Sequence, residues 1–129
     1  TPTHLDDLAA LLEILPEALA IVGRPAFVTA GEHGISLYRS HPDRSRWRST
    51  LVPAYPVPGP IDICGAGDSC SAGITSGMVS GLTHEQAAAF GNLVASITIQ
   101  QIGVTGTATP EQVRQRWREV SGGENDPAT

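Results

Sequence analysis

The stretch at residues 61–73 restricts the fold of this chain more than any other part of its sequence. An aspartate flanked by isoleucines leads into a glycine-rich turn made of Gly65, Ala66, Gly67 and Asp68. Glycine adopts backbone angles that other residues avoid, so the two glycines allow a tight turn whose N–H groups stay exposed. The sequence therefore predicts a helix that begins at this turn and runs to about residue 80, where Gly81 ends it.

The segments before this turn have the patterns of β-strands. Residues 26–29 read as a short buried strand, residues 30–34 as a turn with two glycines, and residues 35–38 as a second strand. This order predicts a hairpin. Residues 47–57 form a further extended segment, and its prolines suit the edge of a sheet.

Three further helices are expected. Leucines recur at helical spacing over residues 3–15. Capping boxes at Thr83 and Thr109 open two more helices, which we expect to end near residues 102 and 120. Strands followed by helices indicate an α/β layered fold in which helices pack on a sheet.

Length and charge narrow the class of protein. The 129 residues, 40% of them hydrophobic, suffice for one domain, which we assign to residues 1–120, with residues 121–129 as a flexible polar tail. The net charge is −5 and no basic stripe is present, so we expect no nucleic-acid partner. No long apolar run or signal peptide is visible, which predicts no membrane partner. The two thiols, Cys64 and Cys70, indicate reduced cysteines in a cytoplasmic protein.

Arginines and glutamates alternate on the last predicted helix. This pattern is typical of a solvated helix face. We therefore predict that three arginines face solvent: Arg114, Arg116 and Arg118.

The predicted helix start at residues 65–68 has a chemical consequence. Exposed N–H groups and the positive end of the helix dipole favour a bound anion. The carboxylate of Asp68 would repel a phosphate, unless it accepts a proton from an attacking hydroxyl while the N–H groups hold the transferring phosphoryl group. A P-loop is excluded because no lysine follows, and a dinucleotide fingerprint because Cys70 takes its third small position. These four residues alone equally allow an aspartate that only complements the helix dipole.

Residues 62–68, Asp-Ile-Cys-Gly-Ala-Gly-Asp, resemble the second signature of the ribokinase/PfkB family of carbohydrate kinases, usually D-T-x-G-A-G-D. The resemblance implies the C-terminal part of a ribokinase-like α/β fold, with ATP and Mg²⁺ as cofactors and a sugar or sugar-phosphate substrate. It makes Asp68 the base that deprotonates the sugar hydroxyl, and it forms the anion hole from Gly65, Ala66 and Gly67. The chain departs from the pattern, without loss of the chemistry, at Ile63, Cys64 and Cys70.

Two more segments are similar to family motifs. Residues 28–34 resemble V-T-x-G-x-x-G, which implies that Thr29 and Gly31 border the nucleotide. Read alone, this segment favours an ordinary glycine-containing hairpin turn. The predicted helix after Thr83 resembles the family helix on which adenine lies, and it makes Asn92 a nucleotide contact. Ala88, Asn92 and Ser96 share one face of this helix at a spacing of four residues, and such a face of small residues also suits close packing of the helix on a sheet.

Family members often bind a monovalent cation, such as K⁺, beside the anion hole. The resemblance implies a cation site formed by Asp62, Cys64, Gln101, Gly103 and Thr107. Equal activity in sodium, potassium and large organic cations would contradict this expectation.

Whole family members are about twice as long, and the part that contacts the sugar is not recognisable here. We therefore expect the isolated chain to bind nucleotide weakly and to lack activity. The missing strands would leave an open sheet edge, which predicts either self-association into a homo-oligomer or a marginally stable monomer. The main hypothesis is an ATP-dependent sugar kinase. The alternatives are a non-catalytic nucleotide- or anion-binding module and, less favoured because of Cys70, a nicotinamide-dependent oxidoreductase.

Overall fold

The computed structural model describes residues 13, 17, 23–40 and 47–122. Apart from Glu13, which is helical, the helix expected over residues 3–15 lies outside the described residues. Residues 41–46 and nearly all of the expected tail also lie outside them.

The described strands form one antiparallel sheet in the order β1-β2-β3. The strands are β1 (Ala26–Thr29), β2 (Ile35–Ser40) and β3 (Trp47–Val52). The expected hairpin is confirmed, with Thr29 opposite Ile35, and a short 3₁₀ turn, η1 (Gly31–His33), joins its strands. β3 ends five residues before the predicted limit, because Pro53 has no N–H to continue the ladder.

Three α-helices follow the sheet: α2 (Ala66–Val79), α3 (His84–Thr98) and α4 (Pro110–Ser121). Both capping boxes are present as predicted. Thr83 accepts from the Gln86 amide at the start of α3, and Thr109 does the same with Gln112 at the start of α4.

The prediction that α3 reaches residue 102 was wrong by four residues. The Ile99 amide still donates to the Ala95 carbonyl, but the amides of Gln100 and Gln101 make only tighter bonds, three residues back. The Ile99 carbonyl accepts from the Asp62 amide at 2.7 Å, and the Gly103 amide donates to the Asp62 carboxylate at 2.8 Å. The tighter bonds close the end of the helix, and the two bonds to Asp62 hold the chain that follows it.

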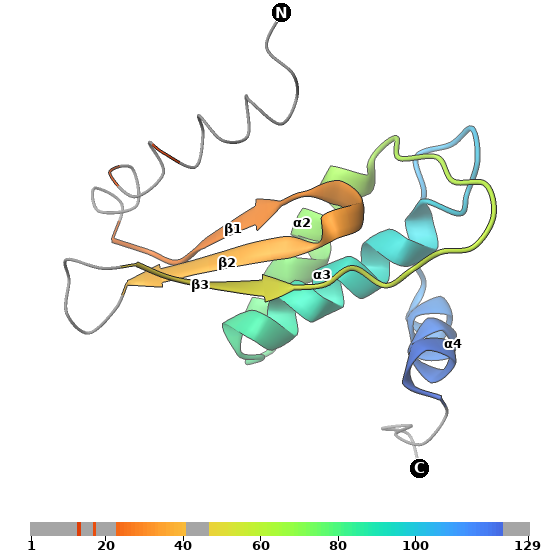
Figure 1. The fold of residues 1–129 in the computed structure, drawn as a ribbon. Helices are drawn as coiled ribbons and strands as arrows, with labels where there is room; N and C mark the ends of the chain where they lie inside the picture. Colours follow the sequence, from red (N-terminus) through yellow and green to blue (C-terminus); the bar gives the residue numbers. More distant parts are fainter. Residues whose placement is uncertain (1–12, 14–16, 18–22, 41–46, 123–129) are drawn as a thin grey trace, which may run out of the picture.

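Helices α2 and α3 lie on one face of the sheet, and α4 lies beyond the C-terminal end of α3 (Figure 1). α3 contacts both β2 and β3. The core between sheet and helices consists of Ile35, Cys70, Ile74, Ala87 and Ala88. This arrangement agrees with the predicted α/β layers.

Glycines bring α2 and α3 into backbone contact. A Cβ atom on Gly73 would lie 2.9 Å from the Gly91 Cα, and one on Gly91 would lie 2.7 Å from Ile74 Cγ1 and 2.9 Å from the Cys70 carbonyl oxygen. Real Cβ atoms do not approach other atoms this closely. Each missing side chain is therefore filled by the facing helix.

A methyl group at position 91 should destabilise the fold. We expect Gly91→Ala to lower the free energy of unfolding by about 1–3 kcal/mol, since the helices must move apart. Gly67→Ala is the matched control, because its Cβ would meet no atom within 4 Å and alanine favours helix. Urea unfolding followed by circular dichroism measures both, and equal midpoints would contradict the packing argument.

Candidate active site

The turn before α2 requires glycine at position 65. Gly65 is the N-cap of α2 with φ 78° and ψ 0°, in the left-handed region. A Cβ there would also lie 3.1 Å from Thr105 Cγ2, on the loop that follows α3. Strain and crowding thus both exclude a side chain at this point of the turn.

The amides at the start of α2 divide into engaged and open groups. The Ala66 amide donates to the Ile63 carbonyl at 3.1 Å. No side chain caps the helix, and the amides of Gly65, Gly67 and Asp68 have no acceptor within the described part of the chain. Of the three residues expected to form the anion hole, the structure leaves Gly65 and Gly67 open and uses the Ala66 amide within the turn. The open amides lie at the positive end of the helix dipole.

Asp68 lies in the first turn of α2 and is exposed. Its carboxylate has no hydrogen-bond or ion-pair partner among the residues that the structure describes. It therefore shares one helical turn with open N–H donors, and both of its oxygens are free to accept a proton.

Asp62 is a backbone clip between two loops. One carboxylate oxygen accepts from the Cys64 amide at 3.0 Å and the other from the Gly103 amide at 2.8 Å. These two N–H donors, first Cys64 and then Gly103, hold the pKa of the Asp62 carboxyl below its usual value. The clip fixes the segment that precedes the anion turn against the loop that follows α3.

The five expected cation ligands lie on these two loops and bond to one another. Gln101 donates to the Thr107 carbonyl at 2.7 Å and accepts from the Thr107 amide at 3.0 Å. Asp62 accepts hydrogen bonds from the amides of Cys64 and Gly103, as described above. Within the described ranges, no three His, Cys, Asp or Glu side chains cluster as a metal site. A cation here would have to share the oxygens of Asp62, Gln101 and Thr107 with the N–H groups that now bond them.

Thr29 and Gly31 are both exposed at the β1–β2 turn. The turn precedes Ile35, which belongs to the same core cluster as Cys70 near the start of α2. The β1–β2 turn and the start of α2, which carries Asp68, are thus each followed by a residue of the same core cluster. Gly34 closes the turn with φ 92°, and a Cβ on it would lie 2.2 Å from the Val52 carbonyl oxygen. Glycine is therefore required where β3 passes the turn.

Asn92 is 6% exposed and bonds the chain itself. Its side-chain amide donates to the carbonyl oxygens of Val52 and Pro53, both at 3.1 Å. Ala88 and Ser96, on the same face of α3, are buried as well. These contacts support the packing interpretation of this face, and a nucleotide contact by Asn92 stays a prediction.

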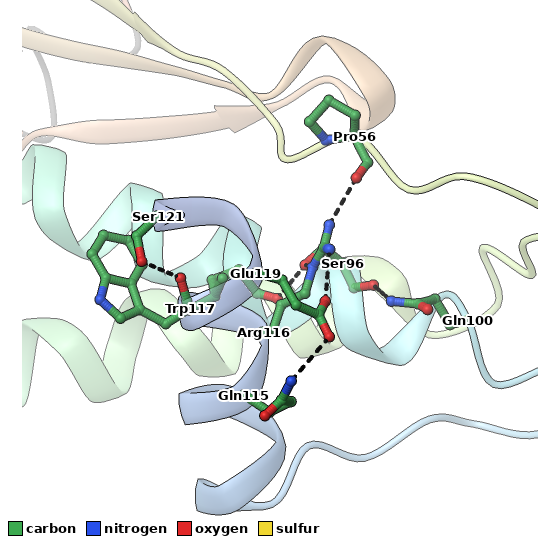
Figure 2. Close-up of polar contacts among 9 residues, drawn as sticks. Pro56, Ser96, Gln100, Gln115, Arg116, Trp117, Glu119 and Ser121 are labelled. Carbon is green, nitrogen blue, oxygen red and sulfur yellow. Dashed lines mark hydrogen bonds and ion pairs between the residues drawn. The ribbon is translucent and has the colours of Figure 1, made fainter. Parts of the chain in front are cut away.

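The prediction that Arg116 faces solvent was wrong. Arg116 is 9% exposed and bonds α3 and the segment after β3 (Figure 2). The spacing of α4 contains the missed signal, because Val113, Trp117 and Val120 mark an apolar stripe to which position 116 also belongs. Arg114 and Arg118 are exposed, as expected.

No helix of the described part of the chain is both long and apolar enough to span a bilayer.

A family model for pfkB family carbohydrate kinases matches residues 1–112. Ribokinase of Bacillus subtilis (strain 168) is 30% identical over 92 residues, which cover 71% of this chain and 29% of that protein. Inositol 3-kinase of Arabidopsis thaliana is 40% identical over 76 residues, which cover 59% of this chain and 20% of that protein.

Comparison with solved structures also finds kinases of this fold. Adenosine kinase from Sinorhizobium meliloti superposes with a TM-score of 0.64 at 31% identity, over 81% of this chain and 30% of that chain. The chain thus spans less than a third of the length of these relatives. The expected ribokinase-like fold is confirmed, and with the family model matching most of its length, the chain belongs to the pfkB family of carbohydrate kinases.

Proposed function

We propose that this chain is the phosphate-binding and catalytic part of an ATP-dependent kinase, with Asp68 as the general base. One observation carries the proposal. An exposed carboxylate without a partner in the described part of the chain lies in the same helical turn as open backbone amides. Such a turn suits a reaction in which negative charge develops on a phosphoryl group while a nearby hydroxyl loses its proton.

In the proposed reaction the acceptor hydroxyl oxygen attacks the γ-phosphorus of ATP. The new O–P bond forms as the bond from the γ-phosphorus to the bridging oxygen breaks, and ADP leaves with that electron pair. Asp68 takes the proton of the hydroxyl. The amides of Gly65 and Gly67 and the α2 dipole stabilise the charge on the equatorial oxygens, while Ala66 keeps the turn closed through Ile63. Mg²⁺, when bound with ATP, supplies further charge neutralisation.

We infer that ATP approaches from the side of the β1–β2 turn. Thr29 and Gly31 are exposed there, and a Cβ on Gly31 would meet no atom within 4 Å, so the backbone is open to a ligand. Asn92 is the weakest of the proposed nucleotide contacts, because its N–H groups already bond the end of β3.

The names of the relatives support a proposal for the class of acceptor. Ribokinase, inositol 3-kinase and adenosine kinase are named for substrates that carry several hydroxyl groups. We propose a sugar, a sugar phosphate or a similar polyhydroxyl compound. Since the chain spans less than a third of these relatives, we expect it to bind nucleotide by itself and to need further polypeptide for phosphorylation.

A monovalent cation such as K⁺ is a further proposal. Asp62, Gln101 and the nearby carbonyl groups lie on loops that face each other beside the anion turn. Asp62 already holds the two loops together through its two hydrogen bonds, so the fold of the loops does not require a cation. Cation dependence therefore has to be measured as a change in the activity of the kinase.

Asp68→Asn should abolish most turnover and preserve binding of ATP. We expect the rate to fall by roughly 10²–10⁴-fold, since the amide accepts no proton. The affinity for ATP should stay equal or rise, because a negative charge beside the phosphates is removed. Turnover is measured on the polypeptide that has the activity, this chain or a longer one containing it, and affinity by calorimetry on this chain.

Glu111→Gln is the matched control, because Glu111 is also an exposed carboxylate in the first turn of a helix. It should change neither quantity. Undiminished turnover in Asp68→Asn would favour the alternative, a non-catalytic anion-binding module. A chain that binds neither ATP nor inorganic phosphate would overturn both functions.

Asp62 should stabilise the fold in a pH-dependent way. Its folded-state pKa is lowered by hydrogen bonds from Cys64 and Gly103, so its contribution is present above the unfolded value of about 3.9 and is lost as the pH falls through the folded value. Asp62→Asn should therefore unfold at lower urea than the native chain at neutral pH, and the two midpoints should converge below about pH 4. A difference that is the same at all pH values would argue against the clip.

A further inference from the structure

The segment that joins β3 to the anion turn has no regular structure of its own. It runs over residues 53–61, and four of its residues are prolines: Pro53, Pro56, Pro58 and Pro60. Proline has no N–H, and its carbonyl oxygen must find a donor elsewhere when it is buried. We call residues 53–61 the linker. Its course must be fixed by side chains from other elements.

Arg116 of α4 is one of these side chains. Its Nη2 donates to the Pro56 carbonyl oxygen at 2.7 Å, and its Nε donates to Ser96 Oγ of α3 at 3.0 Å (Figure 2). Nη1 bonds the Glu119 carboxylate at 3.2 Å. The guanidinium group is planar and always charged, so one side chain connects α4, α3 and the linker in fixed directions.

The partners of Arg116 are themselves held in place. Ser96 Oγ donates to the Leu93 carbonyl at 2.7 Å, and the Ser96 carbonyl accepts from Gln100 at 2.9 Å. The buried serine hydroxyl is thus oriented by α3 and offers its lone pair to Arg116. Arg116 is 9% exposed and Ser96 3%, so the bond between them is shielded from competing water, whereas the Glu119 carboxylate is half exposed.

We propose that Arg116 is a positioning residue for the anion turn, acting through Pro56 and the linker. The linker is held at its start by Asn92, in its middle by Arg116 and just after its end at Asp62 by Ile99. Arg116 supplies the middle attachment. Its loss lets residues 57–61 move, which loosens the Asp62 clip and the turn at residues 65–68. The effect of Arg116 on the position of the anion turn can be tested in this chain alone. The importance of that effect for catalysis rests on the proposed function.

Hydrogen–deuterium exchange on the whole chain tests the proposal, with Arg116→Met as the variant. The methionine keeps much of the apolar stem and leaves Pro56 without its donor. The amides of Asp62, Cys64 and Gly103, which are bonded in the native chain, should exchange roughly tenfold to hundredfold faster. If Arg116 only anchors α4, faster exchange would be confined to residues 110–121, and that result overturns the proposal.

Two controls separate the contacts. Arg114→Met makes the same change at an exposed position of α4 and should leave exchange at residues 57–69 unaltered. Glu119→Gln removes the ion pair and keeps the Pro56 contact, so exchange should rise in α4 alone. Loosening of the linker in either control would contradict the role given to the Pro56 contact.

Arg116→Lys covers the case in which the methionine variant does not fold. Lysine keeps the charge without the planar fork, so it cannot reach Pro56, Ser96 and Glu119 together. We expect the same pattern with a smaller increase, and native exchange at Asp62 and Gly103 in this variant would overturn the proposal. Calorimetry with ATP on the native chain tests the proposed function separately, since its failure leaves the exchange result unaffected.

Discussion

The contact between glycines of α2 and α3 is the constraint on which the rest of this structure depends. Without side chains at Gly73 and Gly91, the two helices approach until backbone meets backbone. Cys70 and Ile74 then reach the core beneath the sheet, and the first turn of α2 is fixed relative to α3. The position of Asp68 follows from this packing, because that residue begins the same helix. A rigid helix start is what a site needs if its amides are to meet a phosphoryl group without reorganisation.

Helix α3 also sets the path of the chain into the site. Asn92, Ser96 and Ile99 recur at intervals of four and three residues, which places them on one stripe of the helix. Asn92 bonds the end of β3, Ser96 holds Arg116 on Pro56, and Ile99 accepts from Asp62. The family resemblance implies that adenine lies on this face of small and polar residues. In the described part of the chain, Asn92 on this face bonds the carbonyl oxygens of Val52 and Pro53, and a nucleotide contact stays a prediction.

The features that could be predicted from the sequence are those that depend on residues close together in the chain. The capping boxes at Thr83 and Thr109 and the glycine turn at residue 65 fix helix starts within four residues of chain, so their patterns were sufficient. The end of α3 was missed because its last groups bond Asp62, about 40 residues away, and no local pattern records such a partner. Arg116 was missed because alternating charges suggest a solvated face, whereas its position on the stripe with Val113 was the better guide.

Two aspartates six residues apart show how backbone donors separate structural from chemical carboxylates. Both oxygens of Asp62 accept amides, which lowers its pKa and commits it to holding two loops together. Asp68 lies in the first turn of α2. In the described part of the chain no amide donates to its carboxylate, and its oxygens have no other partner. A carboxylate that already accepts two hydrogen bonds is a poor proton acceptor. The proposed base is therefore the second aspartate, and the first supplies the geometry in which it can act.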